Sequence, residues 1–241
     1  AALGTGFFLH HRLAIHGTFQ RFQMNKKALF IAAAVALLLA FVVGALFYAS
    51  QKDKQSAQLV DTNREALIRM HSPTLGNPDA PVVIVEFLDP ACETCRAFYP
   101  LVKDILAANP GQIRLVLRYA PFHNGSDKVV AVLEAARKQG KFWPALEALL
   151  ATQDDWSPHH TPQVELVWPH LEGLGLDLEQ MRIDMHAPEI ANLIAQDLAD
   201  ADTLKVNKTP EFFVNGKPLP SFGYAQLKAL VDEALNEAKR R

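Results

Sequence analysis

The sequence feature that most constrains the fold is a pair of cysteines placed between an apolar strand and a helix. Cys92 and Cys95 are the only cysteines in the chain, and they follow the run Val82–Leu88, which is rich in β-branched residues. Such a run, bounded by turn-forming residues, predicts a buried strand, and the segment after Cys92 predicts a helix. Ile113–Tyr119 predicts a second strand. Because parallel strands need a crossover between them, we expect a β-α-β unit here.

Further along the chain, a helical block and a second strand pair complete the order of elements. Residues 124–204 predict several helices, the first of them capped by Ser126. The segment Glu211–Val214 predicts a strand, and Asn215-Gly216 after it is typical of a two-residue hairpin turn. An amphipathic helix follows the hairpin. We therefore expect an α/β fold with β-α-β and β-β-α halves and an inserted helical subdomain.

The position of the two cysteines indicates redox chemistry. A thiol at a helix N-terminus meets unpaired N–H groups and the positive end of the helix dipole, and both favour the reactive thiolate. Cys92 is thus expected to be the exposed nucleophile and Cys95, one turn further in, the resolving thiol. A zinc half-site and an inert disulfide are the alternatives. A structural zinc site usually brings four ligands, and so short a disulfide loop adds little stability.

Two more features predict parts of the same site. Glu86 interrupts the apolar strand six residues before Cys92. A carboxylate beneath the pair would take and return the proton of Cys95 through a buried water; alternatively, Glu86 points to solvent beside an edge strand. Thr209-Pro210 directly precedes the third predicted strand. A cis bond there would free the backbone of Thr209 to pair with an extended substrate, and an ordinary trans turn is the alternative.

The first fifty residues differ in character from the rest. Residues 28–49 form an uncharged apolar run of 22 residues, enough to cross a hydrocarbon core of roughly 30 Å as a helix. Lys26 and Lys27 precede the run, and the positive-inside tendency places that side in the cytoplasm. We expect a single-pass signal anchor in a bacterial inner membrane, with the catalytic domain in the periplasm; a cleaved signal peptide is the alternative.

These patterns divide the chain into four parts. Residues 1–27 are interpreted as an N-terminal extension and cytoplasmic flank, with 1–23 an upstream addition to a start at Met24. Residues 28–49 form the anchor and residues 50–75 a polar linker, with a short helix expected through Arg64–Arg69. Residues 76–241 form the folded domain, with its helical insertion at about 124–204.

Charge and histidine placement exclude two classes of partner. All 26 acidic residues but only 20 of the 24 basic ones lie from residue 51 onward, so this part carries a formal charge of about −6. Nucleic-acid binding needs a basic surface, and no nucleic-acid partner is expected. His159 and His160 lie in a loop between two prolines. Adjacent histidines rarely bind one ion well, so we expect a solvated loop and no metal site.

Several motifs occur together between Ser72 and the C-terminus. They are Gly76-Asn-Pro-x-Ala-Pro before the strand, Glu86, the C-x-x-C, the helical insertion with Gln139-Gly-Lys-Phe-Trp, and Thr-Pro-Glu-Phe-Phe-Val-Asn-Gly-Lys from Thr209. In combination they resemble the DsbA-like thiol–disulfide oxidoreductases. The resemblance implies a thioredoxin fold, cis Pro210 facing the cysteines, and exchange with cysteine-containing extracytoplasmic proteins. It also implies recharging by a membrane redox partner, without a diffusible cofactor.

The residues between the cysteines depart from this family. Its well-known oxidants have Pro-His there, whereas this chain has Glu93-Thr94. A carboxylate next to Cys92 opposes formation of the thiolate, so we expect its pKa to be lowered less and the disulfide to be a weaker oxidant. The direction of exchange stays open, because a reductase or isomerase would use the same residues. A membrane-anchored copper- or zinc-binding module is the alternative from another class.

Overall fold

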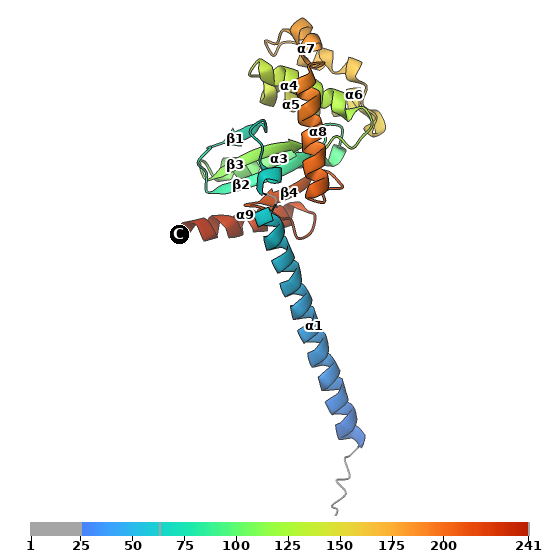
Figure 1. The fold of residues 1–241 in the computed structure, drawn as a ribbon, viewed down its shortest axis with the longest axis vertical. Coiled ribbons are helices and arrows are strands. Elements are labelled where there is room, and N and C mark those ends of the chain that lie inside the picture. Colours follow the sequence, from blue (N-terminus) through green and yellow to red (C-terminus); the bar gives the residue numbers. More distant parts are fainter. Residues whose placement is uncertain (1–25, 63, 241) are drawn as a thin grey trace, which may run out of the picture. The chain divides into compact units, whose positions relative to one another are not determined.

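The computed structural model describes residues 26–62 and 64–240, in two units divided between Gln51 and Lys52 (Figure 1). The first unit holds most of α1 (Lys26–Thr62), along which large apolar side chains such as Phe30, Leu37 and Phe41 are exposed. Within the described ranges, no helix meets the combined length and apolar character required of a membrane span. The interpretation of residues 1–23 lies outside the described residues.

Helical structure occupies much of the segment predicted to be a linker. α1 continues to Thr62, and β1 (Thr74–Gly76) also falls within residues 50–75. α2 (Arg64–Leu67) lies where a short helix was expected. Residues 51–62 contain neither Gly nor Pro. Their Gln, Lys and Ala residues have favourable helix propensities, and polarity alone does not prevent a helix.

A mixed five-stranded sheet forms the centre of the second unit, in the order β1-β3-β2-β4-β5. The remaining strands are β2 (Val82–Leu88), β3 (Ile113–Tyr119), β4 (Glu211–Val214) and β5 (Lys217–Pro218). β2 pairs in parallel with β3 and antiparallel with β4, where Glu86 lies opposite Phe212. β2 is thus a central strand, which explains its continuous apolar sequence.

The edge strand β1 was not predicted from the sequence. It has three residues and pairs antiparallel with β3, too short a segment for a hydrophobic pattern. Its last residue, Gly76, has a φ of 98°, and a Cβ there would collide with the carbonyl oxygen of Ile113. The turn predicted after it is present, since the N–H of Ala80 donates to the carbonyl oxygen of Asn77 at 3.1 Å.

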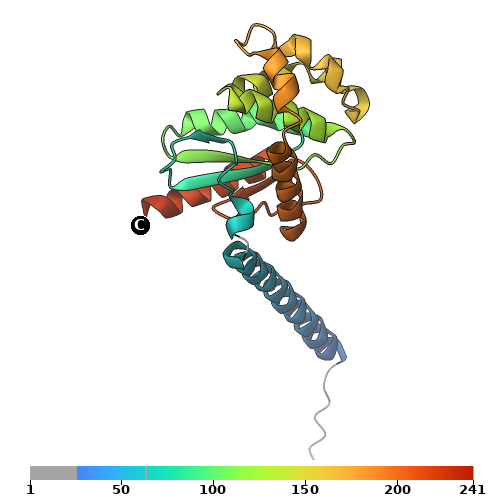
Figure 2. The ribbon, with the colours of Figure 1, turned by 45° about the horizontal axis from the view of Figure 1, so that its top comes forward.

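Helices cover both faces of the sheet (Figure 2). On one face, α3 (Glu93–Ala108) and α9 (Tyr224–Lys239) pack Val102 and Leu227 into a core that includes Ile84. On the other face, α2 and the C-terminal part of α8 (Pro188–Thr203) pack against Phe87 and its neighbours. Glu86 shares the strand face of Ile84, because side chains alternate along a strand. It therefore lies on the side of α3.

The predicted helical insertion lies between β3 and β4, and its apolar side chains share one core with the ends of β2 and β3 and the start of α3. Besides α8 it comprises α4 (Ser126–Lys138), α5 (Phe142–Ala151), α6 (Gln153–Trp156), α7 (Leu178–Asp184) and three 3₁₀ turns, η1 (Pro158–His160), η2 (Val164–Leu166) and η3 (Trp168–Leu171). The prediction that Ser126 caps α4 is wrong. Gly125 occupies that position, and the hydroxyl of Ser126 donates to Asp89 instead.

A buried ionic network fixes α8 to the sheet. Arg118 on β3 is fully buried and pairs with Asp197 and Asp200 of α8, at 2.7 Å each. Arg69 also pairs with Asp200 and His71 with Asp197, again at 2.7 Å. Because the carboxylates and the guanidinium satisfy one another, these charges can be buried together.

Candidate active site

Cys92 and Cys95 lie at the N-terminus of α3. Cys92 is the N-cap, with φ −81° and ψ 118°, and its carbonyl oxygen accepts the first helical hydrogen bond from Arg96 at 3.1 Å. Both cysteines are free thiols. Cys92 is only 6% exposed and Cys95 is 0% exposed. The expectation of an exposed Cys92 is thus wrong in degree, because Thr209 lies against its sulfur.

The two thiols have opposite acidities. A hydrogen bond from Cys95 is the largest influence on Cys92 and lowers its pKa to about 5, against the opposing effect of burial. Hydrogen bonds from Thr209 and from the backbone of Cys95 and Thr94 act in the same direction. Burial raises the pKa of Cys95 well above its usual range, and its contact with Cys92 adds to this. Near neutral pH, Cys92 is the thiolate and Cys95 the thiol.

Glu86 is fully buried on the central strand, which excludes the alternative that it points to solvent. Neither of its carboxylate oxygens has a hydrogen-bond partner among the described residues. An unpartnered buried carboxylate is costly. Burial, and secondarily the charge of Cys92, accordingly raise the pKa of Glu86 to about 8. Glu86 is therefore mostly protonated at pH 7.

The loop before β4 covers the sulfur of Cys92. The Thr209–Pro210 bond is cis, and Pro210 is buried. In its thiol form, Cys92 donates through Sγ to the carbonyl oxygen of Thr209 at 3.3 Å. The structure thus brings together Thr209 and Cys92, which are far apart in the sequence.

Asp89 is a site residue that the sequence reasoning missed. It is fully buried, and its carboxylate accepts the backbone N–H of Ala91 and of His123 at 2.9 Å each. Nδ1 of His123 lies 2.6 Å from the same carboxylate, and Ser126 donates to it. The backbone oxygen of Asp89 accepts the N–H of Cys92 at 3.0 Å. Asp89 thereby fixes the turn that leads into Cys92. Its place at the carboxyl end of a buried strand was the available signal.

The helical insertion also reaches the active-site loop. Gln153 on α6 is buried, and its Nε2 donates to the carbonyl oxygens of Pro90 at 2.7 Å and Cys92 at 3.2 Å. Next to it, Asp154 pairs with Arg96 of α3 at 2.7 Å. No local sequence pattern indicates these contacts, because their partners are about 60 residues apart in the chain.

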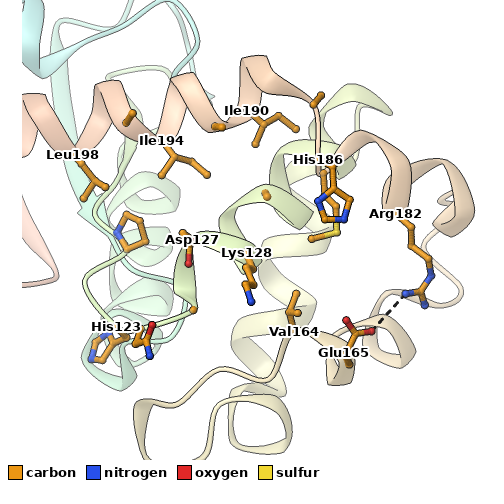
Figure 3. A pocket seen from close by; sticks show the side chains of 18 of the residues that line it. His123, Asp127, Lys128, Val164, Glu165, Arg182, His186, Ile190, Ile194 and Leu198 are labelled. Atoms are coloured by element: carbon orange, nitrogen blue, oxygen red, sulfur yellow. Dashed lines mark ion pairs between the residues drawn. The ribbon is translucent and has the colours of Figure 1, made fainter.

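A cavity of about 840 Å³ lies in the helical insertion, beside His123 (Figure 3). Ile190, Ile194 and Leu198 of α8 line one wall, and Lys128 and Val164 lie across from them. Its lining includes His123 but neither cysteine. The cavity therefore adjoins the residues that support the active-site loop rather than the thiols.

Comparisons with known proteins agree with this geometry. A family model described as thioredoxin matches residues 68–233. The probable disulfide bond formation protein D of Bacillus anthracis is 30% identical over 218 residues, which cover 87% of this chain and 96% of that protein. The antiporter NhaA 3 of Salinispora tropica is 35% identical over 145 residues, or 59% of this chain. The matched part spans only 21% of that antiporter.

Solved structures show the same fold. A thioredoxin-like oxidoreductase from Silicibacter pomeroyi is 36% identical, with a TM-score of 0.62, over 72% of this chain and 98% of that one. The thiol-disulfide exchange protein α-DsbA2 from Wolbachia pipientis is 21% identical, with a TM-score of 0.65, over 76% of this chain and 97% of that one. The second likeness is one of fold alone.

Proposed function

The chain belongs to the DsbA-like thiol–disulfide oxidoreductases of the thioredoxin family, and on this premise we propose that it exchanges disulfides with protein substrates through Cys92 and Cys95. The observation that carries the proposal is the placement of the two thiols at the start of α3, with Cys92 as its N-cap against Thr209 and Cys95 fully buried; their opposite acidities support it. One thiol is set up as a nucleophile and leaving group, and the other keeps its proton until it reacts.

In substrate oxidation, a substrate thiolate attacks the Cys92 sulfur of the oxidised pair. A mixed disulfide forms, the Cys92–Cys95 bond breaks, and the bonding electron pair leaves with Cys95. A second substrate thiolate then attacks the substrate sulfur of the mixed disulfide and releases the Cys92 thiolate. The substrate has lost two electrons and the pair has gained them. In reduction, Cys92 attacks a substrate disulfide and Cys95 resolves the mixed disulfide.

Glu86 serves as the proton reservoir for Cys95 in this proposal. Cys95 leaves as a thiolate whose pKa is well above the usual range, so it takes up a proton at once. Protonated Glu86, with a pKa of about 8, holds that proton on the same face of the sheet. Thr209 and Pro210 supply the surface against which the substrate strand lies beside Cys92.

We propose that the pair is a weaker oxidant than the strong periplasmic oxidases. Stabilising the leaving thiolate makes a disulfide more oxidising. The pKa of Cys92, about 5, falls between the values of about 7 for thioredoxin and about 3.5 for DsbA. The N–H of Thr94 supports the thiolate, and the negative charge of Glu93, the next residue in the chain, is expected to oppose it.

Location and partners are proposed from the sequence. The apolar run 28–49, with basic residues before it, supports a single-pass anchor in a bacterial inner membrane and a domain on the periplasmic side. A membrane redox partner would then recharge the pair, and extracytoplasmic proteins with cysteines would be its substrates. Extraction of membranes with alkaline carbonate tests the anchor, since an anchored chain stays in the pellet. Release of the chain into the supernatant would contradict it.

Paired activity assays test the function. The full chain is expected to oxidise a dithiol peptide and to catalyse insulin reduction by a small thiol, and Cys92→Ser should abolish both. Cys95→Ser is the matched variant: it cannot form the internal disulfide, and it should accumulate mixed disulfides with substrate. Wild-type rates in Cys92→Ser would overturn the proposal. The redox state of the pair in cells gives the direction, mostly oxidised for an oxidase and mostly reduced for a reductase or isomerase.

A further inference from the structure

His160 lies next to the active-site helix rather than in a loop apart from it. Its Nε2 is 3.9 Å from Oε1 of Glu93, the residue that follows Cys92. Its ring stacks on that of His123, with the centroids 5.0 Å apart and an interplanar angle of 19°. The expectation of a merely solvated loop is thus incomplete: the side chain is 45% exposed but has a charged partner.

An unusual backbone turn directs His160 to this place. His159 and His160 have φ values of 53° and 57°, in the left-handed region that non-glycine residues rarely adopt. The turn is closed by a hydrogen bond from the N–H of Gln163 to the carbonyl oxygen of Trp156, at 2.7 Å. Within residues 64–240, no ion pair or ring contact involves the imidazole of His159.

The groups that face His160 are Glu93 and His123. Glu93 comes from α3 and is 51% exposed. His123 comes from the loop before α4, and its other contact is the buried carboxylate of Asp89. Glu93, His160, His123 and Asp89 thus form a continuous line of side-chain contacts, two polar and one a ring stack, that begins and ends beside Cys92.

The charged residues on α6, the other element packed against this turn, already have partners. Asp154 pairs with Arg96 at 2.7 Å, and Asp155 lies 3.8 Å from His170. Among the described residues, Glu93 is therefore the carboxylate available to a protonated His160.

We propose that His160 is a positioning residue for the redox pair, whose imidazolium offsets the charge of Glu93 and so raises the reduction potential. The inference rests on the proposed thiol–disulfide exchange. In the reduced pair Cys92 carries a negative charge, which Glu93 repels and a cation beside Glu93 stabilises. Stabilising the reduced form makes the disulfide more oxidising. The effect requires the protonated imidazole, so it belongs to acidic solution and is absent in alkaline solution.

The reduction potential of the full chain in glutathione buffers measures this effect. His160→Asn removes the charge while tolerating a left-handed backbone, and His159→Asn is the matched control. Both side chains are about half exposed, so solvent screening keeps the effect small. At pH 6 we expect His160→Asn to lower the potential by about 9–21 mV, which is a two- to fivefold change in the equilibrium constant at 29.6 mV per tenfold. At pH 8.5 the variant and the wild type should coincide.

Two further variants separate a charge effect from a structural one. His160→Lys keeps a cation at all pH values and should hold the potential above that of wild type at pH 8.5. In a Glu93→Gln background, His160→Asn should have a smaller effect, because the carboxylate that holds the imidazolium in place is gone. An unchanged potential in His160→Asn at pH 6, or the same decrease in both backgrounds, would overturn the inference. A wild type without exchange activity toward protein substrates would refute the proposed function instead. The equilibrium of the pair with glutathione would still be measurable and would still test the role of His160.

Discussion

Replacing Glu86 by Gln should stabilise the protein at neutral pH and change how its stability depends on pH. In the folded chain, burial raises the pKa of Glu86 from an ordinary 4.5 to about 8. The folded state therefore keeps a proton that the unfolded state releases, and the wild type loses stability as pH rises between these two values. Each unit corresponds to about 1.4 kcal/mol. The loss is about 3 kcal/mol at pH 7 and about 5 kcal/mol above pH 8.

Gln has nearly the same shape but no proton to lose, so Glu86→Gln is free of this pH-dependent loss. Its amide is still buried, which adds a constant difference at all pH values. The informative quantity is thus the unfolding free energy of Glu86→Gln minus that of the wild type, as a function of pH. It should be flat below about pH 4.5, rise by about 1.4 kcal/mol per unit, and level off above about pH 8.

Urea denaturation of the reduced full chain, followed by tryptophan fluorescence, gives this difference. All three tryptophans, Trp143, Trp156 and Trp168, lie in the folded domain. Glu179→Gln is the matched control, because Glu179 is 90% exposed and carries an ion pair only at 3.7 Å. Parallel stability curves for Glu86→Gln and wild type from pH 4 to 8 would refute the reasoning. They would mean that Glu86 ionises in the folded state as readily as in the unfolded chain.

Two further predictions follow from buried charges. The rate at which iodoacetamide alkylates reduced Cys92 should rise with a midpoint near pH 5. Cys95→Ala should raise that midpoint, because the hydrogen bond that stabilises the thiolate most is lost. A midpoint near 8.5 in the wild type would contradict the lowered pKa of Cys92. Arg118→Met leaves Asp197 and Asp200 buried without their central partner. The unfolding free energy, measured in urea, should fall by about 3 kcal/mol. This value is at the lower end of the usual range, because other cations remain near the two carboxylates. A loss below about 1 kcal/mol would show that the network relaxes to water.

The sequence predicted those parts of the site that depend on local patterns. Cys92 and Cys95 could be placed at the start of a helix because strand, turn and helix signals follow one another within twenty residues. The hairpin at Asn215 and Gly216 was predicted for the same reason, and both residues have positive φ, at 47° and 83°. The helical structure of residues 51–62 was not predicted, because polar residues of a linker are also good helix formers.

Contacts between distant segments account for what the sequence could not predict. Asp89 is an ordinary acidic residue until the fold brings His123 and Ser126 to its carboxylate. Gln153 and His160 belong to the helical insertion, and only its packing against α3 places them beside Cys92 and Glu93. Their residue types suit many surface positions, so no spacing rule selects them.

The order of the three buried acids bears on the proton transfer that exchange requires. With Cys92 at about 5, Glu86 at about 8 and Cys95 higher, the reduced site at pH 7 holds one charge and two protons. When Cys95 leaves during substrate oxidation, a protonated Glu86 can neutralise it without recruiting a proton from solvent. In reduction, Cys95 must instead give up its proton, and at pH 7 only a minor fraction of Glu86 is ionised to accept it. We infer that Glu86 carries the proton of the Cys95 step in both directions, and that the ionised fraction of Glu86 that reduction requires grows as the pH approaches 8.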